Sequence, residues 1–209
     1  MSHEKDSIRR EMVSRRKEIS QERRRYTGKV IAHKIVKGEI KQVKKALWVS
    51  TYLSTHDEIP TRYVARALWD AGRGVCVPAW NALDQRYQLC ELHPTIRLVT
   101  GKYGIREPLE QVPVMLWNVD VFILPGLAFD KFGGRLGFGK GIYDSILFRM
   151  NPISIKIGVC YDWQILDSPL PLEPHDISLD WIVSDRRTLN CKQAREDAGL
   201  NTTGDGLFA

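Results

Sequence analysis

The residues with the clearest chemical pattern lie in "GGRLGFGKGIYD", residues 133–144, where five glycines surround Arg135 and Lys140. Successive glycines allow backbone N–H groups to converge on an anion, and the two basic side chains would add positive charge beside it. The segment follows the apolar run "VFILPG", which predicts a buried strand, and it leads into "GIYDSILFRM", which can form a helix. The pattern favours a phosphate-binding loop between a strand and a helix.

Two standard nucleotide motifs fit this loop incompletely. The dinucleotide pattern GxGxxG would require a glycine where Ile142 stands. Residues from Gly134 to Lys140 match the GxxxxGK of a P-loop, but Gly141 replaces the Ser or Thr that binds Mg²⁺ in that motif. A metal ligand would have to come from elsewhere, and Asp144 is the nearest carboxylate. A glycine-rich surface hairpin is the alternative that the glycines alone would favour.

The net charge of +6 comes from the N-terminal segment. Residues 1–45 contain fifteen Lys and Arg against six Asp and Glu, which leaves sixteen against nineteen for the rest of the chain. A solvated helix face, nucleic-acid binding or capture of an acidic small molecule would each explain such a basic arm. Because Tyr26 is the only aromatic residue before Trp48, stacking of single-stranded nucleic acid is poorly supported. Phosphates or carboxylates of a small ligand fit better.

The composition is that of a globular protein with one core. A chain of 209 residues with 43% hydrophobic content can bury a substantial core. No apolar run approaches the roughly 18 residues that cross a bilayer, and the charged start "MSHEKDSIRREM" is unlike a signal peptide, so we expect a cytoplasmic protein without a membrane partner. Cys76, Cys90, Cys160 and Cys191 lack CxxC spacing. Reduced, buried thiols are therefore expected rather than disulfides or a zinc site.

Helix and strand patterns alternate along the chain. Two helices come first, one over "KDSIRREMVSRRKEI" and one that Ser20 caps and that ends near Gly38. The strands "KALWVSTYL" and "GVCVPAW" flank the helix "DEIPTRYVARALWDAG", which has Tyr63, Ala67 and Ala71 on one face. A strand, helix, strand order implies parallel pairing. Further strands are predicted at "QRYQLCEL", "DVFILPG", "SIKIGVCY" and "LDWIVSD".

These elements predict the fold class and the domain organisation. We expect an α/β protein, a three-layer α/β/α domain with a mostly parallel central sheet and an N-terminal basic helical arm. The domain should span residues 1–188. The polar, glycine-rich residues 189–209 should form a loosely packed or disordered tail.

The segment "PGLAFDKFGGRLGFGKGIYD" resembles the signature of the 5-formyltetrahydrofolate cyclo-ligase family, whose members are also called 5,10-methenyltetrahydrofolate synthetases. Matching features lie in register over about residues 5–185, namely "KDSIR", "YLSTHDEIPT", "KYGIREP" and "PHDISLDWIVSD". The resemblance implies an ATP- and Mg²⁺-dependent conversion of 5-formyltetrahydrofolate to 5,10-methenyltetrahydrofolate. ADP and phosphate would be released, through phosphorylation of the formyl oxygen.

The resemblance also implies a nucleotide site. Lys5 and Arg9 would contact the nucleotide phosphates, and their i,i+4 spacing does place them on one helix face. Arg135 and Lys140 would supply the catalytic charges of a loop that wraps the triphosphate. Asp144 and Asp176 would bind Mg²⁺ through hard oxygen ligands. The implied nucleotide-binding residues are Lys5, Arg9, Arg135, Leu136, Gly137, Phe138, Gly139, Lys140, Gly141, Ile142 and Tyr143.

On the folate side, the resemblance implies that Glu58 pairs with the donor edge of the pterin ring. Leu53 would pack against the ligand, and Tyr103 would lie beside it with Phe138 and Ile142. A carboxylate at a helix N-terminus is the alternative for Glu58, and a plain surface aromatic is the alternative for Tyr103. Many family members have Arg or Met in place of Phe138, and Tyr or Phe in place of Ile142. These departures leave open a related-fold ATP-dependent enzyme that acts on another acidic or amide substrate.

The expected partners are ATP and 5-formyltetrahydrofolate, which can carry a polyglutamate tail. We expect Arg15, Arg16, Arg23, Arg24 and Arg25 to be solvated surface residues or to attract that tail. The chain is expected to act as a monomer. The basic arm keeps a non-catalytic nucleic-acid binder as a third hypothesis, which the scarcity of aromatic residues disfavours.

Overall fold

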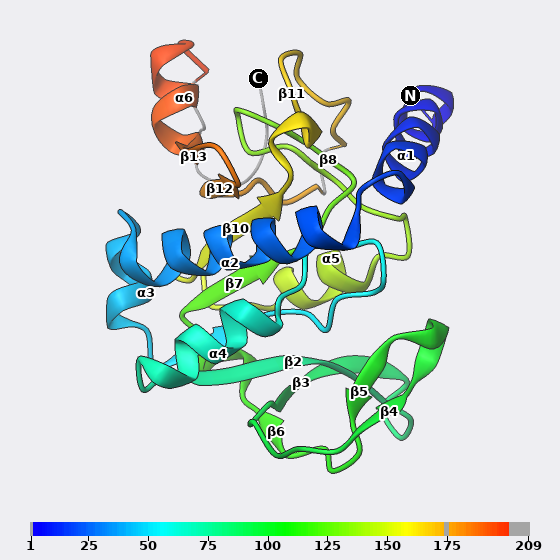
Figure 1. The fold of residues 1–209 in the computed structure, drawn as a ribbon, viewed down its shortest axis with the longest axis vertical. Helices are drawn as coiled ribbons and strands as arrows, with labels where there is room; N and C mark the ends of the chain where they lie inside the picture. The colour runs from blue at the N-terminus through cyan, green and yellow to red at the C-terminus, as the bar shows by residue number, and fades with distance from the viewer. Residues whose placement is uncertain (1, 174–175, 201–209) are drawn as a thin grey trace.

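The chain folds around one eight-stranded sheet in the computed structural model, which describes residues 2–173 and 176–200 (Figure 1). The helices are α1 (Ser2–Lys17), α2 (Gln21–Lys37), α3 (Lys41–Lys45), α4 (Arg62–Asp70), α5 (Ile142–Leu147) and α6 (Cys191–Asp197). The strands are β1 (Trp48–Ser50), β2 (Gly74–Asn81), β3 (Arg86–Glu91), β4 (Leu98–Thr100), β5 (Arg106–Pro108), β6 (Pro113–Val114), β7 (Val121–Leu124), β8 (Ala128–Asp130), β9 (Arg135–Leu136), β10 (Ile155–Cys160), β11 (Ile165–Leu166), β12 (Trp181–Ser184) and β13 (Thr188–Asn190).

The central sheet has the strand order β13-β12-β10-β7-β1-β2-β3-β6. Its middle strands β12, β10, β7, β1 and β2 pair in parallel, whereas β13, β3 and β6 add antiparallel edges. The predicted parallel pairing of the two strands that flank α4 is confirmed, with Val49 opposite Val75. The predicted α/β fold with a mostly parallel central sheet and N-terminal helices is therefore confirmed.

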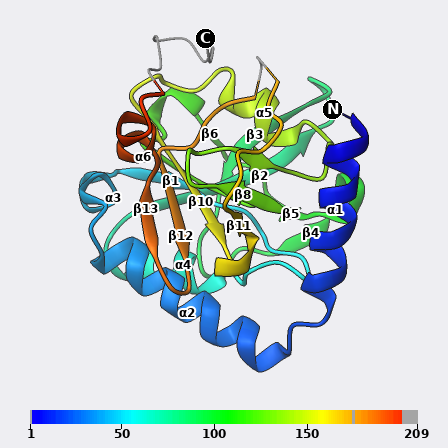
Figure 2. The same ribbon diagram turned by 90° about the horizontal axis from the view of Figure 1, so that it is seen from above.

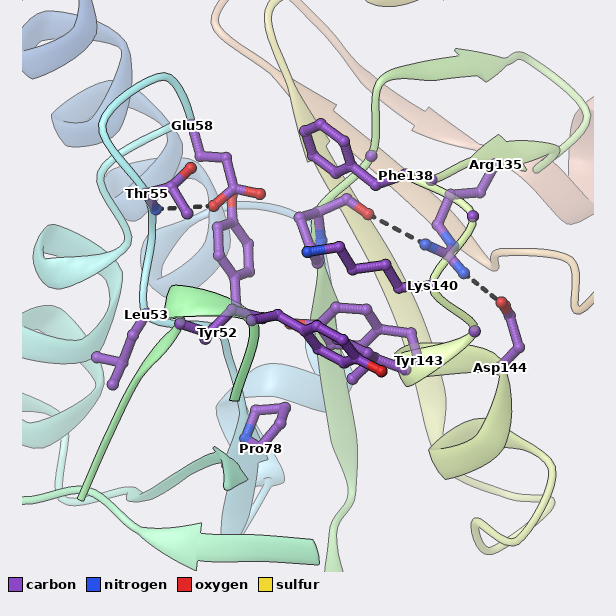
Figure 3. A pocket seen from close by; sticks show the side chains of 18 residues that line it. Tyr52, Leu53, Thr55, Glu58, Pro78, Arg135, Phe138, Lys140, Tyr143 and Asp144 are labelled. Carbon is purple, nitrogen blue, oxygen red and sulfur yellow. Dashed lines mark hydrogen bonds and ion pairs between the residues drawn. The ribbon is translucent and has the colours of Figure 1, made fainter. Parts of the chain in front are cut away.

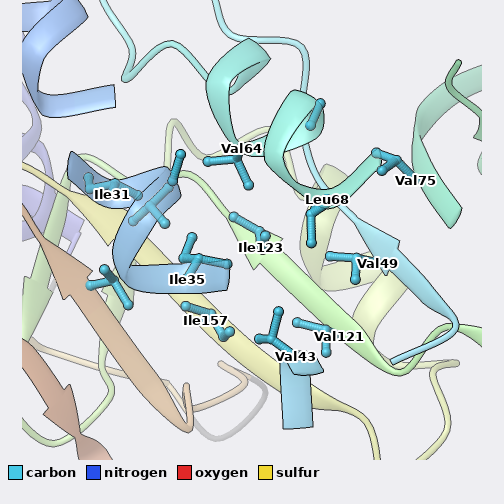
Figure 4. Packing of buried hydrophobic residues seen from close by; sticks show 14 of the residues in the cluster. Ile31, Ile35, Val43, Val49, Val64, Leu68, Val75, Val121, Ile123 and Ile157 are labelled. Carbon is cyan, nitrogen blue, oxygen red and sulfur yellow. The ribbon is translucent and has the colours of Figure 1, made fainter. Parts of the chain in front are cut away.

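Alternating side chains of the central strands build two cores, one on each face of the sheet. In β7, Val121 and Ile123 pack with residues of α2 and α4, and Phe122 and Leu124 pack with residues of α5 and α6 on the opposite face. Figure 4 shows the first core, where the helices α2 and α4 lie over the apolar strands. A strand that is buried on both faces reads as a continuous apolar run, which is why "VFIL" could be identified in the sequence.

The helical arm forms as its capping residues predict. The Ser20 side chain accepts a hydrogen bond from the Arg23 N–H at 3.1 Å, and Gly38 follows the last turn of α2. The chain changes direction between α1 and α2, so the two helices do not form one continuous rod (Figure 2). α1 packs beside the small sheet of β11, β8 and β9. Met12 of α1 is buried in a cluster with Leu127. Among the helices that the structure describes, none combines the length and the apolar character needed to cross a membrane.

The core face of α4 differs from the face picked out in the sequence. Val64 and Leu68 are fully buried over the sheet, whereas Tyr63 and Ala67 are only partly buried. The reason is the neighbouring helix, because the Tyr63 side of α4 faces α2. A Cβ at Gly28 of α2 would lie 2.8 Å from the Tyr63 ring, so glycine allows the two helices to approach. Tertiary packing, not the pattern of small residues, determines which face is buried.

The glycine segment begins with a hairpin, which the glycines alone favoured as the alternative to a phosphate-binding loop, but this hairpin is packed rather than on the surface. β8 and β9 pair antiparallel, and the buried Asp130 carboxylate accepts hydrogen bonds from the N–H groups of Phe132 at 2.8 Å, Gly134 at 3.0 Å and Leu170 at 2.8 Å. Gly133 and Gly134 belong to this turn and line neither of the cavities described below. Of the five glycines expected to bind an anion, only Gly137, Gly139 and Gly141, which follow β9, line these cavities, and their role in binding stays a prediction.

The first part of the expected tail is packed against the sheet. β13 pairs with β12, and Cys191 at the start of α6 is fully buried. The Arg195 side chain donates to the Leu179 carbonyl at 3.3 Å. Residues 189–195 therefore belong to the packed body rather than to a loose tail, whereas residues 196–200 are exposed. Residues 201–209 of that prediction lie outside the described part of the chain. All four cysteines are buried free thiols, as predicted.

Candidate active site

The carboxyl ends of β1 and β7 mark the point where the connections of the sheet change direction. The chain crosses from β1 to β2 on one side and from β7 to β10 on the other. Ligands of open α/β sheets bind in the crevice outside such a topological switch point. Here, residues 52–58 follow β1 on one side of the crevice, and Pro125 and Gly126 follow β7 on the other. Two adjoining cavities lie in this region.

The first cavity, named the aromatic cavity, has a volume of about 260 Å³ and opens between the residues that follow β1 and the glycine loop (Figure 3). All five residues expected to contact the folate line it, namely Leu53, Glu58, Tyr103, Phe138 and Ile142. The remaining lining residues are Tyr52, Thr55, Pro78, Ile105, Pro125, Gly126, Arg135, Gly137, Gly139, Lys140, Gly141, Tyr143 and Asp144.

Glu58 is held by its own loop. One carboxylate oxygen accepts a hydrogen bond from the Thr55 N–H at 2.8 Å, and the Glu58 N–H lies 3.4 Å from the Thr55 carbonyl. The alternative role at a helix N-terminus is not what the geometry shows, because α4 begins only at Arg62 and the carboxylate bonds no amide of that helix. In Figure 3 the side chain of Glu58 faces Phe138 and Lys140 across the aromatic cavity.

Lys140 lies on the aromatic cavity rather than among the other basic residues expected to hold phosphate. Its Nζ is 4.6 Å from the centroid of the Tyr103 ring, a cation–π contact. Tyr103 lies between β4 and β5 with a left-handed backbone, φ 60°, and is 54% exposed. Gly139 and Gly141 on either side of Lys140 also have positive φ, of 80° and 64°. Glycine at these positions lets the loop bend around the lysine.

Arg135 connects the two cavities. Its Nη2 lies 2.6 Å from Asp144 Oδ1, and its Nη1 donates to the Pro125 carbonyl at 3.3 Å. The side chain is 8% exposed, and its Nε is buried with no partner among the described residues. These contacts fix the Arg135 guanidinium where both cavities meet. Burial raises the pKa of the neighbouring Tyr143 hydroxyl and keeps it protonated.

The second cavity, named the polar cavity, has a volume of about 320 Å³. Lys5 Nζ lies 3.1 Å from Asp176 Oδ2 and 3.2 Å from Glu173 Oε1, and Arg9 Nε donates to the Gly137 carbonyl at 3.0 Å. The cavity thus combines basic residues from α1 with carboxylates and with the backbone of the glycine loop. Its lining residues are Lys5, Arg9, Arg135, Leu136, Gly137, Gly139, Gly141, Asp144, Leu170, Pro171, Leu172, Glu173 and Asp176.

Asp144 and Asp176 both line the polar cavity, although they are 32 positions apart in the sequence. One oxygen of each pairs with a cation, and within the described residues the other oxygen accepts no hydrogen bond. Two carboxylates with open oxygens suit Mg²⁺, which commonly takes one or two carboxylates and completes its coordination with substrate phosphates and water. Among the described residues, no group of three or more His, Cys, Asp or Glu side chains could hold a metal ion.

Two buried arginines contradict the expectation that the arginines of the arm are solvated. Arg16 is 3% exposed and Arg24 is 6% exposed, because their guanidinium groups bond to backbone carbonyls of residues 56 and 57. Arg15, Arg23 and Arg25 are exposed, as predicted. Burial of Arg16 could have been suspected, because it follows the buried Met12 by four residues on one helix face.

Comparisons with known proteins identify the family to which the chain is similar. Residues 1–185 match the model of the 5-formyltetrahydrofolate cyclo-ligase family. The chain is 31% identical over 174 residues to the 5-formyltetrahydrofolate cyclo-ligase of Escherichia coli K12, covering 81% of this chain and 94% of that protein. It is 27% identical over 208 residues to the mouse protein of the same name, covering 86% and 92%. The solution structure of Aquifex aeolicus 5,10-methenyltetrahydrofolate synthetase superposes with a TM-score of 0.76 at 30% identity, covering 90% of this chain and 93% of that one.

Proposed function

The chain belongs to the 5-formyltetrahydrofolate cyclo-ligase family, whose activity is an ATP-dependent ligation, and we propose that it performs this reaction across the two adjoining cavities. The observation that supports this arrangement is that the two cavities have lining residues in common. Arg135, Asp144 and the glycines of the loop line both the aromatic cavity and the polar cavity. A folate in one cavity and a triphosphate in the other would meet at Arg135.

The polar cavity takes the nucleotide in this proposal. Lys5, Arg9 and Arg135 supply positive charge, and the loop from Gly137 to Gly141 allows close approach of the phosphates. Each cation already has a carboxylate partner within 3.2 Å. Bound phosphates would compete for these cations, and the carboxylates of Asp144 and Asp176 would turn toward Mg²⁺. The metal, when bound, would neutralise charge on the phosphates and help to orient them.

The aromatic cavity takes 5-formyltetrahydrofolate. Glu58 would accept hydrogen bonds from the pterin, and Tyr103, Phe138 and Ile142 would enclose the rings. The formyl oxygen attacks the terminal phosphorus of ATP, and ADP leaves. The nitrogen at position ten, which links the pterin methylene to the aminobenzoyl group, then attacks the formyl carbon and gives up its proton. The formyl carbon becomes the methenyl bridge as the carbon–oxygen bond breaks and phosphate leaves. Arg135 would stabilise the charge that develops on the transferred phosphoryl group.

A third cavity, a groove lined by several arginines, could bind an acidic extension of the substrate. It shares Leu53 and Glu58 with the aromatic cavity and is also lined by the arginines Arg24, Arg25, Arg62 and Arg106. A polyglutamate tail would run along this groove. We also propose that the chain acts as a monomer.

The direct test mixes the protein, Mg·ATP and 5-formyltetrahydrofolate and follows the absorbance of the methenyl product. Replacing Lys5 or Arg9 by Ala should raise the KM for ATP about tenfold to a hundredfold, as loss of charge-assisted contacts does. Arg10→Ala is the matched control, because Arg10 is exposed on the same helix and should leave the KM unchanged. Glu58→Gln should raise the KM for the folate instead. Absence of product with the unmodified protein would refute the proposal.

A further inference from the structure

The two buried arginines of the arm have a common target. Arg16 lies in the last turn of α1, and Arg24 lies in the first turn of α2. Burial of a guanidinium is unfavourable unless the group is hydrogen-bonded, so its partners indicate its role. Both side chains bond to the segment 54–58, named the Glu58 loop, which links β1 to α4.

Hydrogen bonds and an ion pair from the two arginines fix the Glu58 loop to the helices. Arg16 Nε donates to the Asp57 carbonyl at 3.0 Å, and Arg24 Nη1 donates to the His56 carbonyl. The same Arg24 nitrogen lies 3.5 Å from Asp57 Oδ1. Arg24 Nη2 also donates to the Arg16 carbonyl at 3.3 Å, so the two helices and the loop form one connected unit.

The residue that follows these contacts is Glu58. Among the described residues, its carboxylate accepts a hydrogen bond from the Thr55 N–H of the same loop and from no helix or strand. The position of the carboxylate in the aromatic cavity therefore depends on where the loop is held. Arg16 also lies over the Phe138 ring, with its guanidinium carbon 5.6 Å from the ring centroid. It thus contacts both walls of the aromatic cavity, which Figure 3 shows facing each other.

Fold stability alone explains these arginines poorly. Arg16 Nη2 and Arg24 Nε are buried and have no hydrogen-bond partner among the described residues. A buried charge with incomplete pairing contributes little net stability, and buried unsatisfied polar groups call for a specific explanation. Rigid placement of a ligand-binding carboxylate is such an explanation, since a binding group must be held within a fraction of an ångström to be effective.

We propose that Arg16 and Arg24 are positioning residues for the reaction, which hold the Glu58 carboxylate in place for the pterin of the folate and do not themselves line the aromatic cavity. The inference rests on the proposed function, because it assigns the folate to the aromatic cavity. It predicts that these arginines act through Glu58. A side chain that acts through another loses its effect when that other group is disabled.

The test is a double-mutant cycle between Arg16→Met and Glu58→Gln, read out as kcat, KM for 5-formyltetrahydrofolate and KM for ATP. Methionine keeps the unbranched apolar stem and removes the guanidinium. In the unmodified background, Arg16→Met should lower kcat/KM for the folate about tenfold, mainly through KM, with little change in KM for ATP. In the Glu58→Gln background the same substitution should change kcat/KM less than about twofold. Arg10→Met is the matched control and should be silent in both backgrounds.

Equal effects of Arg16→Met in the two backgrounds would overturn the inference, because a general loss of stability acts whether or not Glu58 is ionised. No effect in the unmodified background would overturn it as well. If circular dichroism shows that the methionine variant does not fold, Arg16→Lys and Arg24→Lys replace it, since lysine keeps the charge but cannot bond through the planar fork. Failure of the proposed function is a separate result, namely no methenyl product from the unmodified protein.

Discussion

Replacing Asp144 by Asn separates the structural role of this carboxylate from its proposed role as a magnesium ligand. Asp144 Oδ1 lies 2.6 Å from Arg135 Nη2, and the two side chains are 40% and 8% exposed. Breaking a fully buried ion pair costs about 3–5 kcal/mol and breaking an exposed pair about 0–1, so this half-buried pair should contribute about 2 kcal/mol. For a domain of this size that corresponds to a fall in Tm of about 4–8 °C.

The matched variant is Asp176→Asn, whose partner Lys5 keeps a second carboxylate, Glu173, at 3.2 Å. Its Tm should therefore fall less than that of Asp144→Asn. Turnover of both variants at limiting Mg²⁺ should fall more than tenfold and recover in part at high Mg²⁺, because each loses a full ligand charge. An unchanged Tm for Asp144→Asn would refute the stability argument. Turnover equal to that of the unmodified protein at limiting Mg²⁺, in both variants, would refute the metal assignment.

Three further predictions concern other parts of the molecule. Gly139→Val places a β-branched side chain at φ 80° and should weaken ATP binding more than tenfold by calorimetry, whereas an unchanged affinity would favour a surface hairpin. Combined Gln replacement of Arg15, Arg23 and Arg25 should leave turnover of monoglutamyl substrate near that of the unmodified protein, and a loss as large as that of Lys5→Ala would contradict it. A thiol reagent at pH 8 should label no cysteine of the folded protein and all four after denaturation, since burial raises each thiol pKa, that of Cys90 to about 11.

The raised thiol pKa values also give a stability profile with a defined sign. The folded state holds the thiol protons of the cysteines more tightly than the unfolded chain does, because the thiols of the unfolded chain have a pKa of about 8.5. The contribution of the protonated thiols to stability is therefore complete below about pH 8.5. It is lost as the pH rises toward the folded pKa of about 11 for Cys90 and about 12 for Cys191. A Tm that rises between pH 9 and 11 would contradict this reasoning.

Sequence patterns within a few residues predicted the helices and strands of the fold. They could not predict contacts between segments that are far apart in the sequence. The apolar strand β7, the cap at Ser20 and the glycines after β9 each have a signal within a few residues. The packing of the β8–β9 hairpin has no such signal, because Asp130 also accepts a hydrogen bond from the N–H of Leu170, 40 residues away. The placement of Lys140 beside Tyr103 depends in the same way on the β4–β5 hairpin.

The candidate site could be predicted because its residues form a spaced family signature. That signature identified residues that line both cavities, but it did not indicate which residue lines which cavity. Lys140 was expected among the cations that bind phosphate, whereas the structure places it on the aromatic cavity. Tyr52 and Pro78, which also line that cavity, carry no local signal of a binding role. The roles of all these residues in binding and catalysis stay predictions until variants are measured.

α1 is attached to the rest of the protein by few apolar contacts, so it can detach locally while the central sheet stays folded. Met12 is its one apolar side chain that is almost fully buried within the described residues, and Ile8 and Val13 are partly buried. So small an apolar contact gives a low free energy of local opening, lower than that of the strands of the central sheet. Its polar anchors, Lys5 and Arg9, face the polar cavity. A bound nucleotide would therefore slow hydrogen–deuterium exchange of the amides of α1, which makes this helix a built-in reporter of site occupancy.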